Sequence, residues 1–234
     1  MGFASFWDKI EPYFNTINHA IIAVVSVYYT VFCWDIGASN LSLHIWLAGI
    51  GYHLLMAEAI IGIYQGNSWS RQHSRRSRFN IHWIMQAVGS TLSISGVLVQ
   101  WFAYGKHHMN NYHSFLGIIS IFFMMGAFLN GTIALWAPEI RKWIKPVYSR
   151  WFHNVIGIIA FAIGMASISH GYDLRDFSRR STVPIMYALK WAAYVTTVLC
   201  LIGAVKSLYE QTKGVIAGIR GSLSTSTSEL PLKS

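Results

Sequence analysis

Histidine is the residue type of this sequence that is best suited to chemistry. Among its ten histidines, His44 and His82 are 38 residues apart, and His113 and His153 are 40 residues apart. All four lie in apolar surroundings, where an ionisable side chain is costly and usually marks a functional site. Neutral imidazole is also the commonest metal ligand in proteins. The spacing therefore predicts metal or cofactor chemistry, built on two similar halves.

The composition indicates a membrane protein. The 234 residues are 53% hydrophobic and 12% charged, about half the charged fraction of an ordinary soluble domain. A helix needs about 20 apolar residues to cross a bilayer. Six segments have that length: residues 16–36, 41–64, 80–104, 112–136, 151–170 and 184–205. We predict an all-α, integral membrane fold with an N-terminal segment 1–15, a transmembrane domain 16–205 and a partly disordered tail 206–234.

The basic residues predict the orientation in the membrane. Thirteen of the eighteen lysines and arginines fall on one side of the six segments, at the termini and in the second and fourth connections. Because cytoplasmic loops carry an excess of basic residues, both termini are expected in the cytoplasm. This topology accounts for the net charge of +9, so the expected partner is the lipid bilayer and not a nucleic acid.

The four histidines fall at two depths. Each is the second to fourth residue of the second, third, fourth or fifth span, and consecutive spans run in opposite directions. His44 and His113 are therefore expected near the outer face, and His82 and His153 near the cytoplasmic face. Alternate helices of a four-helix bundle face each other across its axis, where cofactors are commonly held. Two facing imidazoles suit the axial positions of a six-coordinate haem iron, which transfers electrons. We predict two haems b in a central bundle of the second to fifth spans.

Small residues recur on the face of each of these histidines at helical spacing. They are Ala48, Gly51 and Gly62 in the second span, Gly89 and Gly96 in the third, Gly117 and Ser120 in the fourth, and Gly157, Ala160 and Gly164 in the fifth. Small side chains leave room for a flat macrocycle around the axis. The alternative is that they only allow membrane helices to pack closely.

Other polar residues have less specific roles. His53 is expected on the opposite side of its helix from His44, as a packed or hydrogen-bonded core group, and His19 lies outside the bundle. Glu58 follows His44 by 14 residues near the end of the same face, where it could bind an imidazole or a haem propionate, or anchor the interface.

Three histidines are expected at the outer surface. His107 and His108 lie in the loop before the fourth span, and His170 ends the fifth span. They are candidates for contacts with an electron acceptor or a metal ion, with solvated loop histidines as the alternative.

Four sequence elements around the paired histidines resemble those of the eukaryotic cytochrome b561 family. They are residues 55–61 (Leu-Met-Ala-Glu-Ala-Ile-Ile), 82–86 (His-Trp-Ile-Met-Gln), 112–117 (Tyr-His-Ser-Phe-Leu-Gly) and 152–157 (Phe-His-Asn-Val-Ile-Gly). The resemblance covers about residues 16–205 and is greatest to the short branch without an appended domain. It implies that cytoplasmic ascorbate reduces the haem of His82 and His153, and that the haem of His44 and His113 reduces monodehydroascorbate or ferric iron. It also implies an endomembrane location.

The resemblance suggests where ascorbate would bind. Arg75, Arg76 and Arg78 precede His82 and are candidate contacts for the ascorbate anion; the alternative is that they serve only to set the topology. Ascorbate-using members of the family end their second core helix in Tyr-Arg, whereas this chain has Tyr64-Gln65. The donor is therefore left open.

Two other functions are compatible with the pattern. A membrane cytochrome b subunit that exchanges electrons with quinol would also use paired histidines, and it would ignore ascorbate. A transporter with structural histidines would bind no haem and would be colourless. The first and sixth spans flank the bundle and could form a homodimer.

Overall fold

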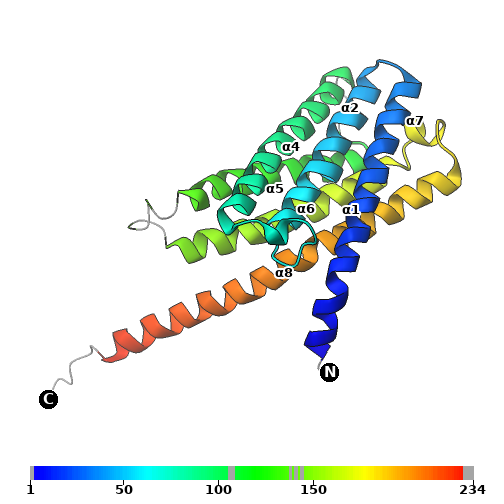
Figure 1. Ribbon diagram of the computed structural model, residues 1–234. Coiled ribbons are helices and arrows are strands. Elements are labelled where there is room, and N and C mark those ends of the chain that lie inside the picture. Colours follow the sequence, from blue (N-terminus) through cyan, green and yellow to red (C-terminus); the bar gives the residue numbers. More distant parts are fainter. Residues whose placement is uncertain (1–2, 105–108, 137–138, 140–141, 143–144, 229–234) are drawn as a thin grey trace.

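The computed structural model describes residues 3–104, 109–136, 139, 142 and 145–228, and side chains within 9–103, 109–136, 139, 142 and 145–220. All regular elements in this part of the chain are helical (Figure 1). They are α1 (Phe3–Ile36), α2 (Asn40–Gly49), the π-helix η1 (Ile50–Met56), α3 (Ala57–Ile63), the 3₁₀-helix η2 (Ser70–Gln72), α4 (Arg75–Tyr104), α5 (Tyr112–Leu135), α6 (Pro146–Gly171), α7 (Arg175–Ser178) and α8 (Val183–Ser228).

Six helical segments of the described chain are long and apolar enough to cross a membrane. Five of them lie in α1, α4, α5, α6 and α8, and the sixth is the continuous helix Asn40–Ile63 formed by α2, η1 and α3. The side chains on the outside of these helices are apolar: Val24, Phe122 and Val198 are all more than 60% exposed. The predicted all-α fold with six spans is confirmed, and the chain is an integral multi-pass membrane protein.

The two ends of the chain lie on the same side of the bundle (Figure 1). We call this side the terminal face; it also carries residues 64–74 between α3 and α4. The opposite face carries residues 37–39 and 172–182. His82 and His153 lie toward the terminal face, because α4 and α6 begin there. His44 and His113 lie toward the opposite face, where α2 and α5 begin.

Local signals fix where the histidine-bearing helices begin. Ser39 caps α2 through a reciprocal pair of hydrogen bonds with Ser42, and Asn111 caps α5 by accepting from the Ser114 amide at 2.9 Å. Such side chains satisfy amide groups that the first turn of a helix leaves unpaired. Pro146 occupies the first position of α6, where its missing N–H costs nothing.

The last helix is longer than the sequence suggested. α8 continues to Ser228, past the predicted span 184–205. The disorder expected in part of the tail stays a prediction, and residues 229–234 lie outside the described residues. Tertiary contacts stabilise the extension: the Trp151 indole donates to Thr212 Oγ1 at 2.9 Å, and Asn154 donates to Gln211 Oε1 at 3.5 Å. α6 thus holds the first turns of α8 beyond residue 205.

The second to fifth spans form two hairpins. α4 packs along α2, η1 and α3, and α5 packs along α6, whereas the two hairpins touch each other at few places. The contact between the two hairpins is therefore sparse compared with the contacts within each hairpin.

Candidate functional site

Each histidine of one hairpin meets a histidine of the other. The ring centroids of His44 and His113 are 5.8 Å apart, with the ring planes at 83°. Those of His82 and His153 are 6.2 Å apart, with the planes at 87°. The structure thus brings together the two pairs expected from the spacing, one at each depth, and both pairs bridge the sparse interface between the hairpins.

All four imidazoles are held in the same way. Nδ1 of His44 lies 2.8 Å from the Gly96 carbonyl, and Nδ1 of His113 lies 2.8 Å from that of Ser167. The corresponding distances are 2.9 Å from His82 to Ala59 and from His153 to Ala127. Because a carbonyl can only accept, each Nδ1 carries the proton and each Nε2 keeps its lone pair. Metal-binding histidines are commonly oriented by such a bond.

The spacing of the rings fits one metal ion between each pair. Two imidazole–metal bonds of about 2 Å, with roughly 1 Å from each nitrogen to its ring centroid, separate the centroids by about 6 Å. A bare ion would need further protein ligands, but the described residues contain no group of three or more His, Cys, Asp or Glu that could hold one. Two facing imidazoles instead fit a metal whose other ligands come from a macrocycle, as in a haem with two axial histidines.

Glycines provide the room that these rings occupy. A Cβ atom on Gly131 would lie 2.8 Å from Cε1 of His153, and one on Gly171 would lie 3.0 Å from Nδ1 of His113. Both distances are shorter than van der Waals contact. Gly157 follows His153 by one helical turn, and a Cβ there would meet nothing within 4 Å. Gly131 and Gly171 therefore pack tightly against the rings of His153 and His113, and there is open space at Gly157, one turn after His153.

An apolar layer separates the two pairs. Tyr52, Met124, Phe161 and Met165 are at most 5% exposed and belong to one core cluster. Tyr52 crosses between the hairpins: its ring stacks on Phe161 with centroids 6.3 Å apart, and its hydroxyl donates to the Ala160 carbonyl at 3.2 Å. This layer keeps water out of the space between the outer and inner pairs.

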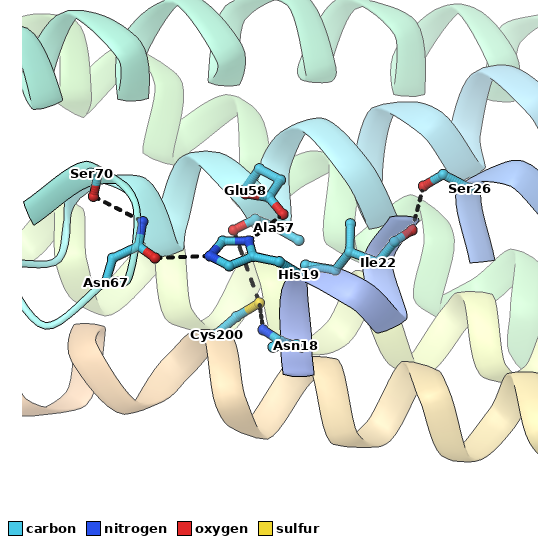
Figure 2. Close-up of polar contacts among 9 residues, drawn as sticks. All are labelled: Asn18, His19, Ile22, Ser26, Ala57, Glu58, Asn67, Ser70 and Cys200. Atoms are coloured by element: carbon cyan, nitrogen blue, oxygen red, sulfur yellow. Dashed lines mark hydrogen bonds and ion pairs between the residues drawn. The ribbon is translucent and has the colours of Figure 1, made fainter. Parts of the chain in front are cut away.

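The π-helix changes the position of Glu58. A π-helix has more residues per turn than an α-helix, so η1 rotates the residues after it relative to an uninterrupted helix. Glu58 consequently does not share the face of His44; it points toward α1, where its Oε1 lies 2.6 Å from Nδ1 of His19 (Figure 2). Of the roles considered for Glu58, the structure shows a bond to an imidazole, but this imidazole is outside the bundle.

His53 and His170 occupy different surroundings. His53 is fully buried, as expected of a core group, but neither of its ring nitrogens has a hydrogen-bond partner among the described residues. His170 is part of the opposite face, 4.0 Å from an oxygen of Asp173 and with its ring 5.6 Å from that of Tyr112. His107 and His108 lie outside the described residues.

The three candidate arginines differ in their environments. Arg75 and Arg76 are exposed at the start of α4, and the Arg75 guanidinium lies 5.6 Å from the Phe79 ring centroid. Arg78 is 7% exposed and donates to the His73 carbonyl at 2.9 Å. Arg78 therefore holds the loop before α4, and Arg75 and Arg76 are the two that a solute can reach.

A lysine lies beside Tyr64, where the sequence lacks the expected arginine. The Lys206 ammonium of α8 lies 3.0 Å from the Tyr64 hydroxyl and 2.7 Å from Glu11 Oε1. Partial burial raises the pKa of the Tyr64 hydroxyl above its usual value. The contact with Lys206 was not apparent from the sequence because the two residues are 142 positions apart in the chain. Since Glu11 compensates the charge of Lys206, the cluster adds no net positive charge.

Comparison with known proteins relates the chain to a family and to a curated relative. The sequence profile of the family described as eukaryotic cytochrome b561 matches residues 43–179, which include all four paired histidines. A curated relative from Arabidopsis thaliana, named probable transmembrane ascorbate ferrireductase 4, is 23% identical over 161 residues. That match covers 68% of this chain and 65% of the relative, just under two thirds of the relative's length.

Proposed function

Because the chain belongs to the eukaryotic cytochrome b561 family, we propose that it transfers electrons across a membrane from cytoplasmic ascorbate to monodehydroascorbate or ferric iron. Two haems b would be held by the paired histidines, one between His82 and His153 near the terminal face and one between His44 and His113 near the opposite face. The assignment to the short branch of the family remains a prediction.

The protein's own groups prepare this site. When bound, each haem would supply a centre that accepts and releases one electron at a time. The backbone carbonyls fix the four imidazoles with Nε2 unprotonated, so no proton has to leave before a metal binds. The layer around Tyr52 and Phe161 excludes water between the two sites.

The observation that carries the proposal is the fourfold repetition of one arrangement. Four histidines on four helices each donate from Nδ1 to a carbonyl of the neighbouring helix in the same hairpin. They meet in two pairs across the interface where the hairpins touch least. Structural histidines in a transporter would have no reason to repeat both the bond and the pairing.

The donor would bind at the terminal face and the acceptor at the opposite face. The excess of basic residues favours a cytoplasmic terminal face, and Arg75 and Arg76 are accessible there to attract the ascorbate anion. On the opposite face, His170 lies beside Tyr112 and is a candidate contact for the acceptor. The match to a relative named as an ascorbate ferrireductase supports ferric iron as one acceptor.

Haem content tests the proposal. The purified protein should contain two haems b with a reduced absorption band typical of two imidazole ligands, and His82→Ala and His153→Ala should each leave about one. His53→Leu is the matched control, because His53 is buried in the same span as His44 but is not paired; this variant should keep both haems. A colourless wild-type protein, or two haems in either alanine variant, would refute the site.

Function is tested by adding the substrates on known sides. Protein in sealed vesicles should be reduced by ascorbate on the terminal-face side and reoxidised by ferric chelate or monodehydroascorbate on the other. Reduction by quinol and not by ascorbate would instead identify a quinol-linked subunit.

A further inference from the structure

Three consecutive residues of α3 each contact a different helix. The Ala57 carbonyl lies 4.0 Å from Sγ of Cys200 in α8, and Glu58 binds His19 in α1. The Ala59 carbonyl accepts from Nδ1 of His82 in α4. Ala57 and Ala59 are fully buried. Glu58 is therefore rigidly connected, through one peptide unit, to the group that orients His82.

His19 faces an acceptor on each of its ring nitrogens (Figure 2). Nδ1 lies 2.6 Å from Glu58 Oε1, and Nε2 lies 2.8 Å from Oδ1 of Asn67. The Asn67 amide is oriented by its own Nδ2, which donates to Ser70 Oγ at 2.8 Å, and both Asn67 and Ser70 are fully buried. An imidazole that donates from both nitrogens is protonated, so His19 and Glu58 form an ion pair.

The ion pair is well shielded from solvent. The side chains of His19 and Glu58 are 18% and 14% exposed, and Asn18, one residue before His19, is fully buried and donates to Cys200 Sγ. Such a pair is almost neutral from a distance, but removal of one partner leaves a charge in a medium of low dielectric constant. The pair joins α1 to α3 directly beside the carbonyl that orients His82.

We propose that His19 and Glu58 set the midpoint potential of the haem bound by His82 and His153. Glu58 acts by the negative charge that it places next to the Ala59 carbonyl, and His19 neutralises that charge. The inference rests on the proposed function, because it presupposes a haem at this pair. It adds α1, which lies outside the four-helix bundle, to the groups that control electron transfer.

Single substitutions should shift the potential in opposite directions. In His19→Gln, the unpaired carboxylate stabilises the oxidised haem and lowers the potential. In Glu58→Gln, the negative charge that stabilises the oxidised haem is removed, and the potential rises. A unit charge roughly 10 Å away, at an effective dielectric constant of about 20, changes the ratio of reduced to oxidised haem on the order of tenfold. For a one-electron couple, a tenfold change is about 59 mV.

The experiment is a spectroelectrochemical titration of both haems at pH 6, in variants shown to contain two haems. His19→Gln should lower one of the two potentials, Glu58→Gln should raise the same one, and the double variant should return it close to the wild-type value. His19→Arg keeps a positive charge and should stay close to wild type, which allows the test even if Glu58→Gln loses haem. Thr30→Val, also on α1 but near the opposite face, is the control and should change neither potential.

The outcomes distinguish failure of this inference from failure of the proposed function. Potentials that shift in the same direction in both single variants, or equal values for His19→Gln and His19→Arg, would overturn this inference while leaving the haem sites intact. A wild-type protein without two haems would instead overturn the proposed function.

Discussion

A methyl group added to Gly131 should displace His153. The new Cβ would lie 2.8 Å from Cε1 and 3.0 Å from Nδ1 of that ring, whereas carbon atoms in contact are about 3.5–4.0 Å apart. The ring must therefore retreat by roughly 0.7 Å. Its bond to the Ala127 carbonyl is 2.9 Å long, and the same displacement would stretch it to about 3.6 Å, beyond the range of a hydrogen bond.

Loss of this bond should weaken haem binding. Groups that orient a metal ligand typically account for 10- to 100-fold in metal affinity, so Gly131→Ala should lower the affinity of the site of His82 and His153 by about that factor. The other site should be unaffected. The assay is titration of the haem-depleted protein with haem, followed by the absorption of the bound form and by the stoichiometry at saturation.

The control lies on the same helix. A Cβ on Gly126 would come no closer than 3.8 Å to another atom, Cγ2 of Ile156, so Gly126→Ala should keep both affinities. Replacement of glycine by alanine favours the helix at both positions, and a difference between the variants therefore reports the contact with His153. Equal affinities for Gly131→Ala and the wild type would show that haem binding depends neither on the present position of the His153 ring nor on its bond to the Ala127 carbonyl.

Three further predictions follow from the described contacts. Gly171→Ala should weaken the site of His44 and His113 and spare the other, because its Cβ would lie 3.0 Å from Nδ1 of His113; the same haem titration checks this. Arg75→Gln and Arg76→Gln should raise the KM for ascorbate several-fold at low salt and leave the melting temperature unchanged, since both residues are exposed. Arg78→Gln should instead lower the stability by about 1–3 kcal/mol by leaving the His73 carbonyl without its donor; kinetics and thermal unfolding of the three variants distinguish the two roles. Asn111→Ala should cost about 1 kcal/mol through loss of the cap of α5, which thermal unfolding measures; an unchanged melting temperature would show that another group satisfies the Ser114 amide.

The pairing of the histidines illustrates what a sequence can reveal about a membrane bundle. Helices that cross a bilayer must alternate in direction, so the place of a histidine within its span also gives its depth. His44 and His113 were therefore expected at one depth and His82 and His153 at the other. The close approach of the rings required only that these four spans form one bundle, which the structure shows.

The hydrogen bonds that hold the rings could not be predicted. Each Nδ1 donates to a backbone carbonyl on a neighbouring helix. The residues that provide these carbonyls, such as Ala59 and Ala127, have side chains that do not indicate a hydrogen-bond acceptor. The choice of carbonyl depends on how far one helix is shifted along the other. That shift is determined by close packing, for example where Gly51 of η1 meets Gly89 of α4.

The sequence by itself determined the number of spans, the depths of the four histidines and the family motifs, because these depend on composition and on the direction of the chain. Only the tertiary structure decided the partners of Glu58, His19 and Lys206. A π-helix turns Glu58 away from the face predicted for a regular helix. Contacts between helices far apart in the chain depend on such rotations, which no local pattern of residues specifies.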